Sequence, residues 1–299
     1  MFQIEQGVLI KYEGDEADVV VPEGVTQIGE EAFADCESMR TLSLPDSTQT
    51  IGRRAFYGCR GLLFVRFGSG LRSIGERAFT SSALTSLTLP DGIEEIEKEA
   101  FYNCRSLKSV NTGGLKSIPA GAFFACVCLS QVTFARPVKS IGYHAFMSCT
   151  ALEKIELPEG LSQLGVGAFL QCSRLREFNF PSTLTEISAE AFHDCGAVEL
   201  HIPASVKKID YHAFGYSMSL KKVVIEEGVE EIENEAFTFL RRLEEAYIPK
   251  SVQKMGERVF HFTNRPRIRC ATQFTPEAWH DNWLGTTRAQ VIWGAKQEK

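Results

Sequence analysis

The pair Ala-Phe recurs along this chain at a nearly constant interval. Successive copies are 22 or 23 residues apart, and this one position holds eleven of the 21 phenylalanines. A period of about 20 to 50 residues is typical of solenoids, in which each repeat packs only on its neighbours. The sequence therefore predicts stacked coils whose phenylalanines form one interior row. The copies are Ala32-Phe33, Ala55-Phe56, Ala78-Phe79, Ala100-Phe101, Ala122-Phe123, Ala145-Phe146, Ala168-Phe169, Ala191-Phe192, Ala213-Phe214, Ala236-Phe237 and, with valine in place of alanine, Val259-Phe260.

A second pattern lies between the Ala-Phe pairs and alternates apolar with polar residues. Such alternation predicts a half-buried strand, and strands at the same position of each coil pair in parallel about 4.8 Å apart. Another short apolar segment, as in Val229 to Ile232, predicts a second ladder on the far side of the coil. Proline ends the alternating strand because it has no amide proton to donate to the ladder. It stands there at Pro45, Pro90, Pro158, Pro181, Pro203 and Pro249.

The full unit reads I-x-x-x-A-F-x-x-C-x-x-L-x-x-V-x-L-P-x-x-[LV]-x-x-I and recurs over about residues 7 to 270. One clean copy consists of Leu152, Ile155, Leu157, Pro158, Leu161, Leu164, Ala168, Phe169 and Cys172. This motif resembles the BspA-type leucine-rich repeat of bacterial surface proteins. The resemblance implies a β-rich, right-handed leucine-rich-repeat solenoid of about ten coils, capped at both ends. It also implies a role in attachment to host or microbial partners.

The two ends of the chain depart from the period. Residues 1–27 are predicted to be an N-terminal cap with hairpin-like halves at Gly7 to Tyr12 and Asp18 to Val21, followed by the solenoid at 28–263. Residues 264–299 are predicted to be a C-terminal cap, because large aromatic side chains cover an open apolar coil end well. We expect one continuous domain. Capping is favoured over an exposed, glycan-stacking role for the tryptophans, which are Trp279, Trp283 and Trp293.

Charge and hydropathy argue against two classes of partner. The net charge of −6 disfavours nucleic acid, because nucleic-acid-binding surfaces are usually basic. No apolar run approaches the roughly 18 residues of a membrane span, so no membrane insertion is expected. The start, MFQIEQGVLIKYEGDE, lacks the basic and apolar regions of a signal peptide. The chain as written is expected in the cytoplasm, or at the cell surface or secreted if an export signal has been removed.

The cysteines follow the repeat. Seven of the nine occupy the third position after the phenylalanine, where Ser82, Ser217 and Leu240 stand in other coils. Serine and leucine as alternatives indicate a small interior position, and free cysteine is among the most buried residue types. Cys126 and Cys128 alone are close-spaced, which does not match a zinc site. No metal and no cofactor are expected. The seven are Cys36, Cys59, Cys104, Cys126, Cys149, Cys172 and Cys195.

No catalytic constellation is predicted. His193, Asp194 and Cys195 are consecutive in sequence, and neighbouring residues do not face one another as a cysteine nucleophile and its base must. His144 and His212 lie three coils apart, roughly 14 Å at strand spacing, which is too far to share a metal. The sequence contains no phosphate-binding loop, nucleophile elbow or zinc-protease helix motif. We therefore expect a protein that is not an enzyme.

Function is expected on the outward positions of the alternating strands. These are small and neutral in the first half of the chain and charged in the second, with aromatic residues at Phe64 and Tyr247. Exposed aromatics often anchor interfaces, although an ordinary solvated sheet face would also fit this pattern. The candidate partner-binding residues are Phe64, Arg66, Lys154, Glu156, Glu177, Glu199, His201, Lys222, Glu245 and Tyr247.

The leading function is a non-catalytic scaffold for protein–protein or adhesion-type interaction, with a protein or a glycan as the partner. The alternative is an intracellular scaffold or effector-like interaction protein. A monomer is expected. A further hypothesis is head-to-tail stacking, because the first 31 residues hold eight acids and one lysine. Solvated charge is the simpler interpretation of those acids and of the basic C-terminal residues Arg265, Arg267, Arg269 and Arg288.

Overall fold

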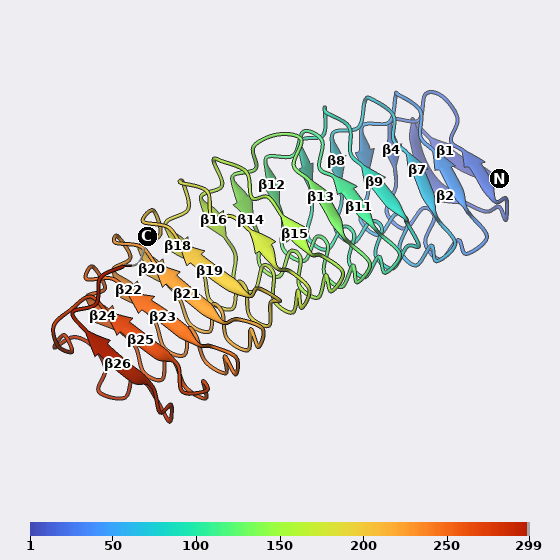
Figure 1. Cartoon of the computed structure of the whole chain (residues 1–299). Coiled ribbons are helices and arrows are strands. Elements are labelled where there is room, and N and C mark those ends of the chain that lie inside the picture. Colours follow the sequence, from blue (N-terminus) through green and yellow to red (C-terminus); the bar gives the residue numbers. More distant parts are fainter. Residues whose placement is uncertain (298–299) are drawn as a thin grey trace. The chain divides into compact units, whose positions relative to one another are not determined.

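The computed structural model describes residues 1–297 and shows strands joined by turns (Figure 1). The chain divides into two compact units, Met1–Leu152 and Glu153–Lys299. Within each unit short strands from successive coils stand side by side, so the predicted β-rich solenoid is confirmed. Residues 298–299, the end of the predicted C-terminal cap, lie outside the described residues.

Unit 1 carries two sets of strands on opposite sides of its coils, and all but the first strand of the chain run parallel to their neighbours. The strands of the outer face pair in the same register, so that Thr41 lies opposite Phe64 and Ser43 opposite Arg66. The second set stacks Ile28, Ile51 and Ile74, which are all buried. Outer-face strands are β3 (Asp18–Val20), β5 (Thr41–Ser43), β7 (Phe64–Arg66), β9 (Ser86–Thr88), β11 (Ser109–Asn111) and β13 (Gln131–Thr133). The other set contains β1 (Phe2–Glu5), β2 (Val8–Tyr12), β4 (Gln27–Ile28), β6 (Thr50–Ile51), β8 (Ser73–Ile74), β10 (Glu95–Ile96), β12 (Ser117–Ile118) and β14 (Ser140–Ile141).

Unit 2 repeats this plan. Its second ladder includes β22 (Glu231–Ile232), which confirms the ladder predicted from Val229 to Ile232. The same sheet contains β18 (Glu186–Ile187), β20 (Lys208–Ile209) and β24 (Lys254–Met255), and β16 (Gln163–Leu164) holds the equivalent position in the coil before β18. Outer-face strands are β15 (Lys154–Ile155), β17 (Glu177–Phe178), β19 (Glu199–Ile202), β21 (Lys222–Ile225), β23 (Glu245–Ile248), β25 (Arg267–Cys270) and β26 (Gln290–Trp293).

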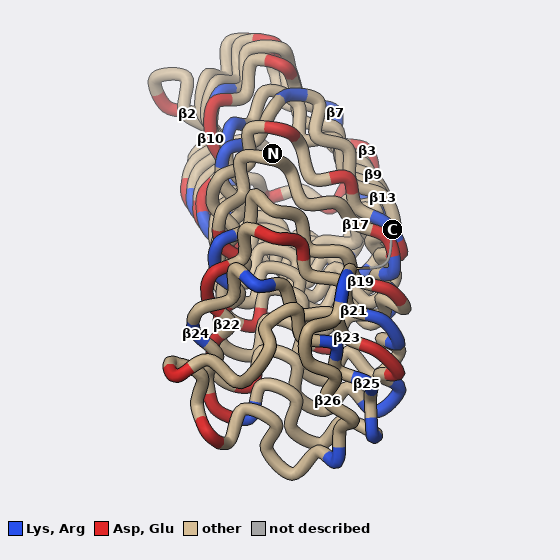
Figure 2. The backbone as a smooth tube through the Cα atoms, turned by 60° about the vertical axis from the view of Figure 1, so that its left-hand side comes forward, with Lys and Arg blue, Asp and Glu red and all other residues tan. Residues whose placement is uncertain are grey.

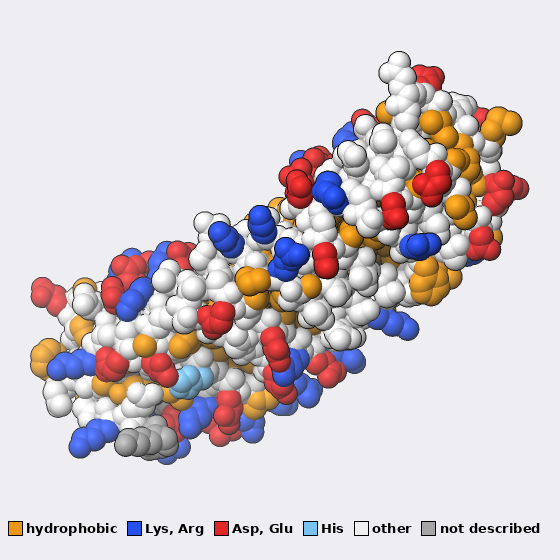
Figure 3. Space-filling view, turned by 90° about the horizontal axis from the view of Figure 1, so that it is seen from above, with side chains coloured by type: hydrophobic (Ala, Val, Ile, Leu, Met, Phe, Trp, Pro, Cys, Tyr) orange, Lys and Arg blue, Asp and Glu red, His pale blue; other side chains and the backbone are white. Residues whose placement is uncertain are grey.

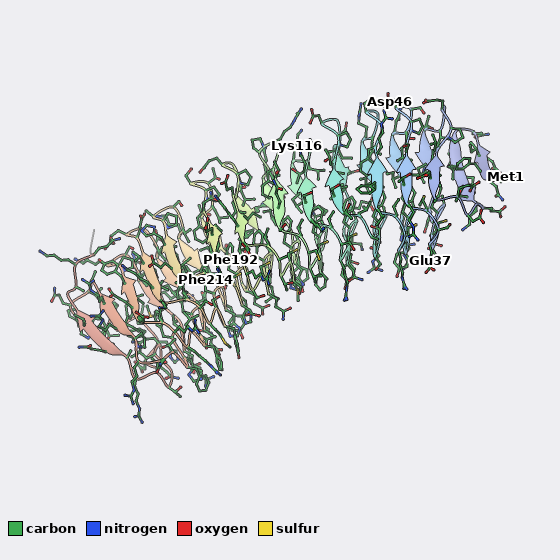
Figure 4. All side chains as sticks on the ribbon, turned by 45° about the vertical axis from the view of Figure 1, so that its right-hand side comes forward. Met1, Glu37, Asp46, Lys116, Phe192 and Phe214 are labelled. Carbon is green, nitrogen blue, oxygen red and sulfur yellow. The ribbon has the colours of Figure 1, made fainter. Side chains whose placement is uncertain are left out.

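The repeated phenylalanines form the predicted interior row. All eleven are among the largest fully buried side chains. Successive rings stack with centroids 4.8 to 5.6 Å apart in unit 1 and 5.4 to 5.7 Å apart in unit 2. Figure 4 labels one such pair, Phe192 and Phe214, at 5.7 Å. Offset-stacked rings at these spacings attract one another beyond the gain from burial alone.

The Ala-Phe turn is held by backbone geometry that the sequence pattern does not reveal. The residue before the alanine and the second residue after the phenylalanine are left-handed in every coil, as at Arg54 and Gly58, with φ between 51° and 72°. Most of these positions are not glycine, and each such residue costs about 1 kcal/mol or more. The two reversals direct three amides of one coil toward carbonyls of the next. The Phe56 amide, for example, donates to the Ala78 carbonyl at 2.7 Å.

The repeated cysteine has a bonding role inside the coil. The thiol of Cys59 donates to the Phe33 carbonyl oxygen at 3.0 Å, and Cys104, Cys126, Cys149 and Cys195 make the same bond in their coils. The Ser217 hydroxyl takes over this bond to the Phe192 carbonyl at 3.2 Å. The prediction of a small interior position is confirmed, and the alternation of cysteine with serine follows because both side chains donate to a carbonyl.

The N-terminal end differs from the predicted hairpin halves. The hairpin is formed by β1 and β2, joined at Gln6 and Gly7, whose φ values of 48° and 80° suit a two-residue reversal. Asp18–Val20 pairs in parallel with β5 and is already part of the outer face. The prediction of a hairpin strand there was wrong because one alternating segment looks the same in a hairpin and in a parallel ladder.

At the C-terminal end two tryptophans cover the last coil. Trp279 and Trp283 are 3% and 4% exposed. The Trp279 indole donates to the Val252 carbonyl at 3.1 Å, and Trp283 packs edge-on against Phe260 with centroids 6.0 Å apart. Neither ring is accessible for stacking on a sugar, so the capping interpretation holds for both. Trp293 is half-buried.

Removing one ring from the row should be costly. Phe101→Ala leaves a cavity between two stacked rings, so we expect a loss of about 3–5 kcal/mol in the free energy of unfolding, measured by urea denaturation followed by circular dichroism. Phe64→Ala is the matched control, because Phe64 is 52% exposed, and it should change that free energy by under about 1 kcal/mol. Equal losses for the two variants would refute the interior row.

The thiols should differ sharply in reactivity. Burial raises the pKa of Cys59 and of Cys270 to about 12, and it also raises the pKa of half-buried Cys36. At pH 8 Cys59 and Cys270 therefore hold almost no thiolate, the reactive form, and the other buried thiols of the row are shielded from reagent. Cys128 is exposed. We expect one fast-reacting thiol in the native protein with Ellman's reagent, lost in Cys128→Ser. Several fast equivalents in that variant would contradict the buried row.

Candidate functional site

The outer face of unit 1 exposes apolar side chains among small polar ones. Phe64 is 52% exposed on β7, which confirms that this ring faces solvent, and Arg66 is exposed on the same strand. Val20, on the row that Ser43 and Arg66 continue, is 68% exposed. An exposed aromatic with an arginine two residues away is a composition enriched at protein interfaces. This face is the first candidate site.

The outer face of unit 2 is charged and largely paired with itself. Lys154 Nζ lies 3.0 Å from Glu156 Oε1 and 4.0 Å from Glu177 Oε2, and its hydrogen bond to Glu156 raises the pKa of Lys154. His201 Nε2 lies 3.5 Å from Glu226 Oε1. The predicted residues Glu199 and Lys222 are exposed on β19 and β21. Figure 3 shows the same intermixing of acidic and basic side chains over the surface in view.

Glu245 binds two arginines at the C-terminal end of this face. Its carboxylate accepts from Arg267 at 3.4 Å and from Arg269 at 3.1 Å. Glu245 is therefore half-buried and already satisfied by its own unit. A partner that used Glu245 would have to displace these arginines.

The expectation that Tyr247 is exposed was wrong. Its side chain is 6% exposed. The chain beyond β26 returns over this position: the Ala295 amide donates to the Cys270 carbonyl at 3.0 Å, and Arg269 Nη2 donates to the Lys296 carbonyl at 2.8 Å. Burial raises the pKa of Tyr247, while a hydrogen bond from the Gln297 backbone opposes that rise. The alternation of the strand predicts the outward direction of this ring and cannot predict the segment that covers it.

His193, Asp194 and Cys195 do not converge. The Cys195 thiol points inward to the Phe169 carbonyl at 3.4 Å. The His193 ring instead stacks near His212 of the next coil, with centroids 5.6 Å apart, and lies 5.0 Å from Tyr216. Burial is the main cause that lowers the pKa of His193, and burial raises the pKa of Asp194. The imidazole therefore belongs to a row of aromatic side chains along the turns of unit 2, which we call the aromatic turn edge.

This aromatic turn edge was not predicted from the sequence. In unit 2, Tyr216 stacks on Phe239 at 4.3 Å, and Phe239 packs on half-exposed Phe262 at 4.6 Å. All three hold the left-handed position two residues after the repeated phenylalanine. These three aromatic residues could have been found in the sequence by comparing that one position in successive coils.

Unit 2 also carries a basic hollow of about 530 Å³. It opens between the turns that precede β21, β23 and β25, where Figure 2 shows basic segments beside those strands. Of its cations, only Arg265 and Arg267 belong to the basic C-terminal residues noted in the sequence. The lining residues are Lys221, Arg241, Arg242, Leu243, Glu244, Asn264, Arg265 and Arg267.

Some of the acids on which the head-to-tail hypothesis depends already have partners within unit 1. Glu30 and Glu31 already pair with Arg53 and Arg54 at 2.7 and 3.3 Å. The Tyr12 hydroxyl donates to Glu16, and burial together with this bond raises the pKa of Tyr12 to about 12. Stacking through the chain ends stays a hypothesis.

Within residues 1–297, no three or more histidine, cysteine, aspartate or glutamate side chains gather in a way that could hold a metal ion. Nor does that part of the chain form a helix long and apolar enough to cross a membrane.

Comparison with known proteins identifies the family of the repeat. The family model described as BspA type leucine rich repeat region matches in six copies, at residues 26–153, 110–219 and 139–267. No curated protein matches the sequence. Two similar solved structures are a leucine rich cell surface protein from Faecalibacterium prausnitzii and a leucine-rich repeat protein from Bacteroides ovatus.

The F. prausnitzii structure is 22% identical, with a TM-score of 0.54 over 97% of this chain and 91% of that chain. The B. ovatus structure is 24% identical, with a TM-score of 0.56 over 92% of this chain and 84% of that chain. These structures share the fold, and the family model covers most of the sequence. The chain therefore belongs to the BspA-type leucine-rich-repeat family.

Proposed function

We propose that this protein is a non-catalytic, adhesion-type binding scaffold whose outer face in unit 1 contacts a protein partner around Phe64. The observation that carries this proposal is the exposed Phe64 ring on a rigid strand, with Arg66 two residues away. Aromatic and arginine side chains dominate interface energetics. Because β7 is fixed by pairing with β5, little conformational freedom is lost on binding.

The unit 2 candidates have a different role in this proposal. Lys154, Glu156, Glu177 and Glu245 lie near opposite charges of their own unit, and His201 contacts Glu226, so a partner gains little net energy from them. We assign them, with Glu199 and Lys222, to selecting a partner by charge. Tyr247 is omitted because it is buried.

A surface setting and the absence of catalysis are part of the same proposal. The similar F. prausnitzii protein is described as a leucine rich cell surface protein, which supports an attachment role over an intracellular effector role. The separation of His193 from Cys195 supports a non-catalytic function, because a cysteine nucleophile needs its base within hydrogen-bond reach.

The proposal is tested by cross-linking from the face itself. A photoreactive benzoylphenylalanine at position 64 should capture a cell-surface protein that the same group at position 274 does not, because Phe274 is 74% exposed but lies in unit 2. With the captured protein purified, Phe64→Ser should weaken the dissociation constant by roughly 10-fold or more, measured by calorimetry. Identical captures from the two positions, or an unchanged dissociation constant, would show that this face is not the binding surface.

A further inference from the structure

We propose that the basic hollow of unit 2 binds a sulfated oligosaccharide. This site belongs to unit 2, whereas Phe64 belongs to unit 1, and it takes a different class of ligand, so the inference goes beyond the proposed function. It rests on the hollow's shape, its unpaired cations and the uncharged groups beside them.

Three successive coils build the hollow. The Glu244 amide donates to the Lys221 carbonyl at 2.8 Å, and the Arg267 amide donates to the Glu244 carbonyl at 2.9 Å. Each coil therefore contributes side chains at the spacing of a parallel ladder, about 4.8 Å. The backbone at the rim is fixed, so the cations are held together by the fold.

The hollow is strongly cationic in an acidic protein. Five of its eight lining residues are lysine or arginine, against the single carboxylate of Glu244, while the whole chain has a net charge of −6. Lys221 lies 3.4 Å from Glu244, and Arg267 lies 3.4 Å from Glu245.

The remaining three cations are exposed and pair with no carboxylate of residues 1–297; they are Arg241, Arg242 and Arg265. Like charges that line one hollow repel one another, and a bound anion would relieve that repulsion.

The chemistry of the lining selects the anion. Guanidinium groups present planar forks that match the oxygens of sulfate, phosphate and carboxylate groups. No aromatic side chain lines the hollow, so it offers no platform on which a nucleobase would stack. Glu244 would repel a compact ion such as pyrophosphate. In an oligosaccharide, by contrast, sulfates are spaced along the chain, and the hydroxyls between them can bond to Glu244 and Asn264.

Calorimetry with a heparin-derived hexasaccharide tests this inference on the full-length protein. The native chain should bind the hexasaccharide, and the chemically desulfated hexasaccharide should not bind. The variant Arg241→Ser, Arg242→Ser, Arg265→Ser should weaken the dissociation constant by roughly 30-fold or more, since three exposed guanidinium groups lose their charge-assisted bonds to the sulfates. An unchanged thermal unfolding midpoint shows that the variant is folded.

A matched control removes the same charge elsewhere in unit 2. Arg174→Ser, Arg176→Ser, Lys250→Ser alters three exposed cations outside the hollow and should leave hexasaccharide binding nearly unchanged. Phe64→Ser should also leave it unchanged, which separates this test from that of the proposed function. An equal loss in the control variant, or equally tight binding of single-stranded DNA or pyrophosphate, would overturn the inference.

Discussion

The stacked phenylalanine row is the interaction on which the rest of the structure depends. A coil of 22 or 23 residues is too short to enclose a core of its own, so each ring is buried by the rings of neighbouring coils. To bring the ring inside, the chain reverses twice through left-handed residues. That local cost is offset by burial of the ring, which contributes roughly 1.5–3 kcal/mol, and by the amide bonds between turns. Alanine fits because a larger side chain beside the ring would separate the coils.

Much of the fold could be predicted from the sequence because its physical demands repeat. Each inward position recurs in eleven coils, so a residue type that the packing requires appears repeatedly. The preference for Phe, Ala, Cys or Ser at these positions can therefore be recognised in one sequence. At outward positions the residue type varies from coil to coil, so no such repetition indicates what each one does. Phe64 is 52% exposed, as its outward position in the alternating strand predicts. Tyr247 is also an outward residue, at the position in its strand that corresponds to Arg66, and it is buried because the non-repeating segment near Ala295 covers it.

The basic hollow is a second feature that could not be predicted from the sequence. Arg241 and Arg242 occupy variable positions of their coil, and Arg265 lies where the period begins to fail. In sequence they are three unremarkable surface arginines. They form a site because coils about 4.8 Å apart bring variable positions from different repeats together. In a solenoid, reading one repeat position down successive coils recovers such neighbours, whereas reading along the chain does not.

The Ala-Phe turns also give unit 2 an electrical polarity. Their amides all point the same way: Phe192 donates to Ala213, Phe214 to Ala236 and Phe237 to Val259, each at 2.9 Å. Peptide dipoles aligned head to tail add, as they do along an α-helix. Here the positive end lies toward the last coil, where carbonyls of Asn282 and Trp283 accept the final donors. The closing segment thus neutralises an accumulated partial charge as well as covering apolar surface.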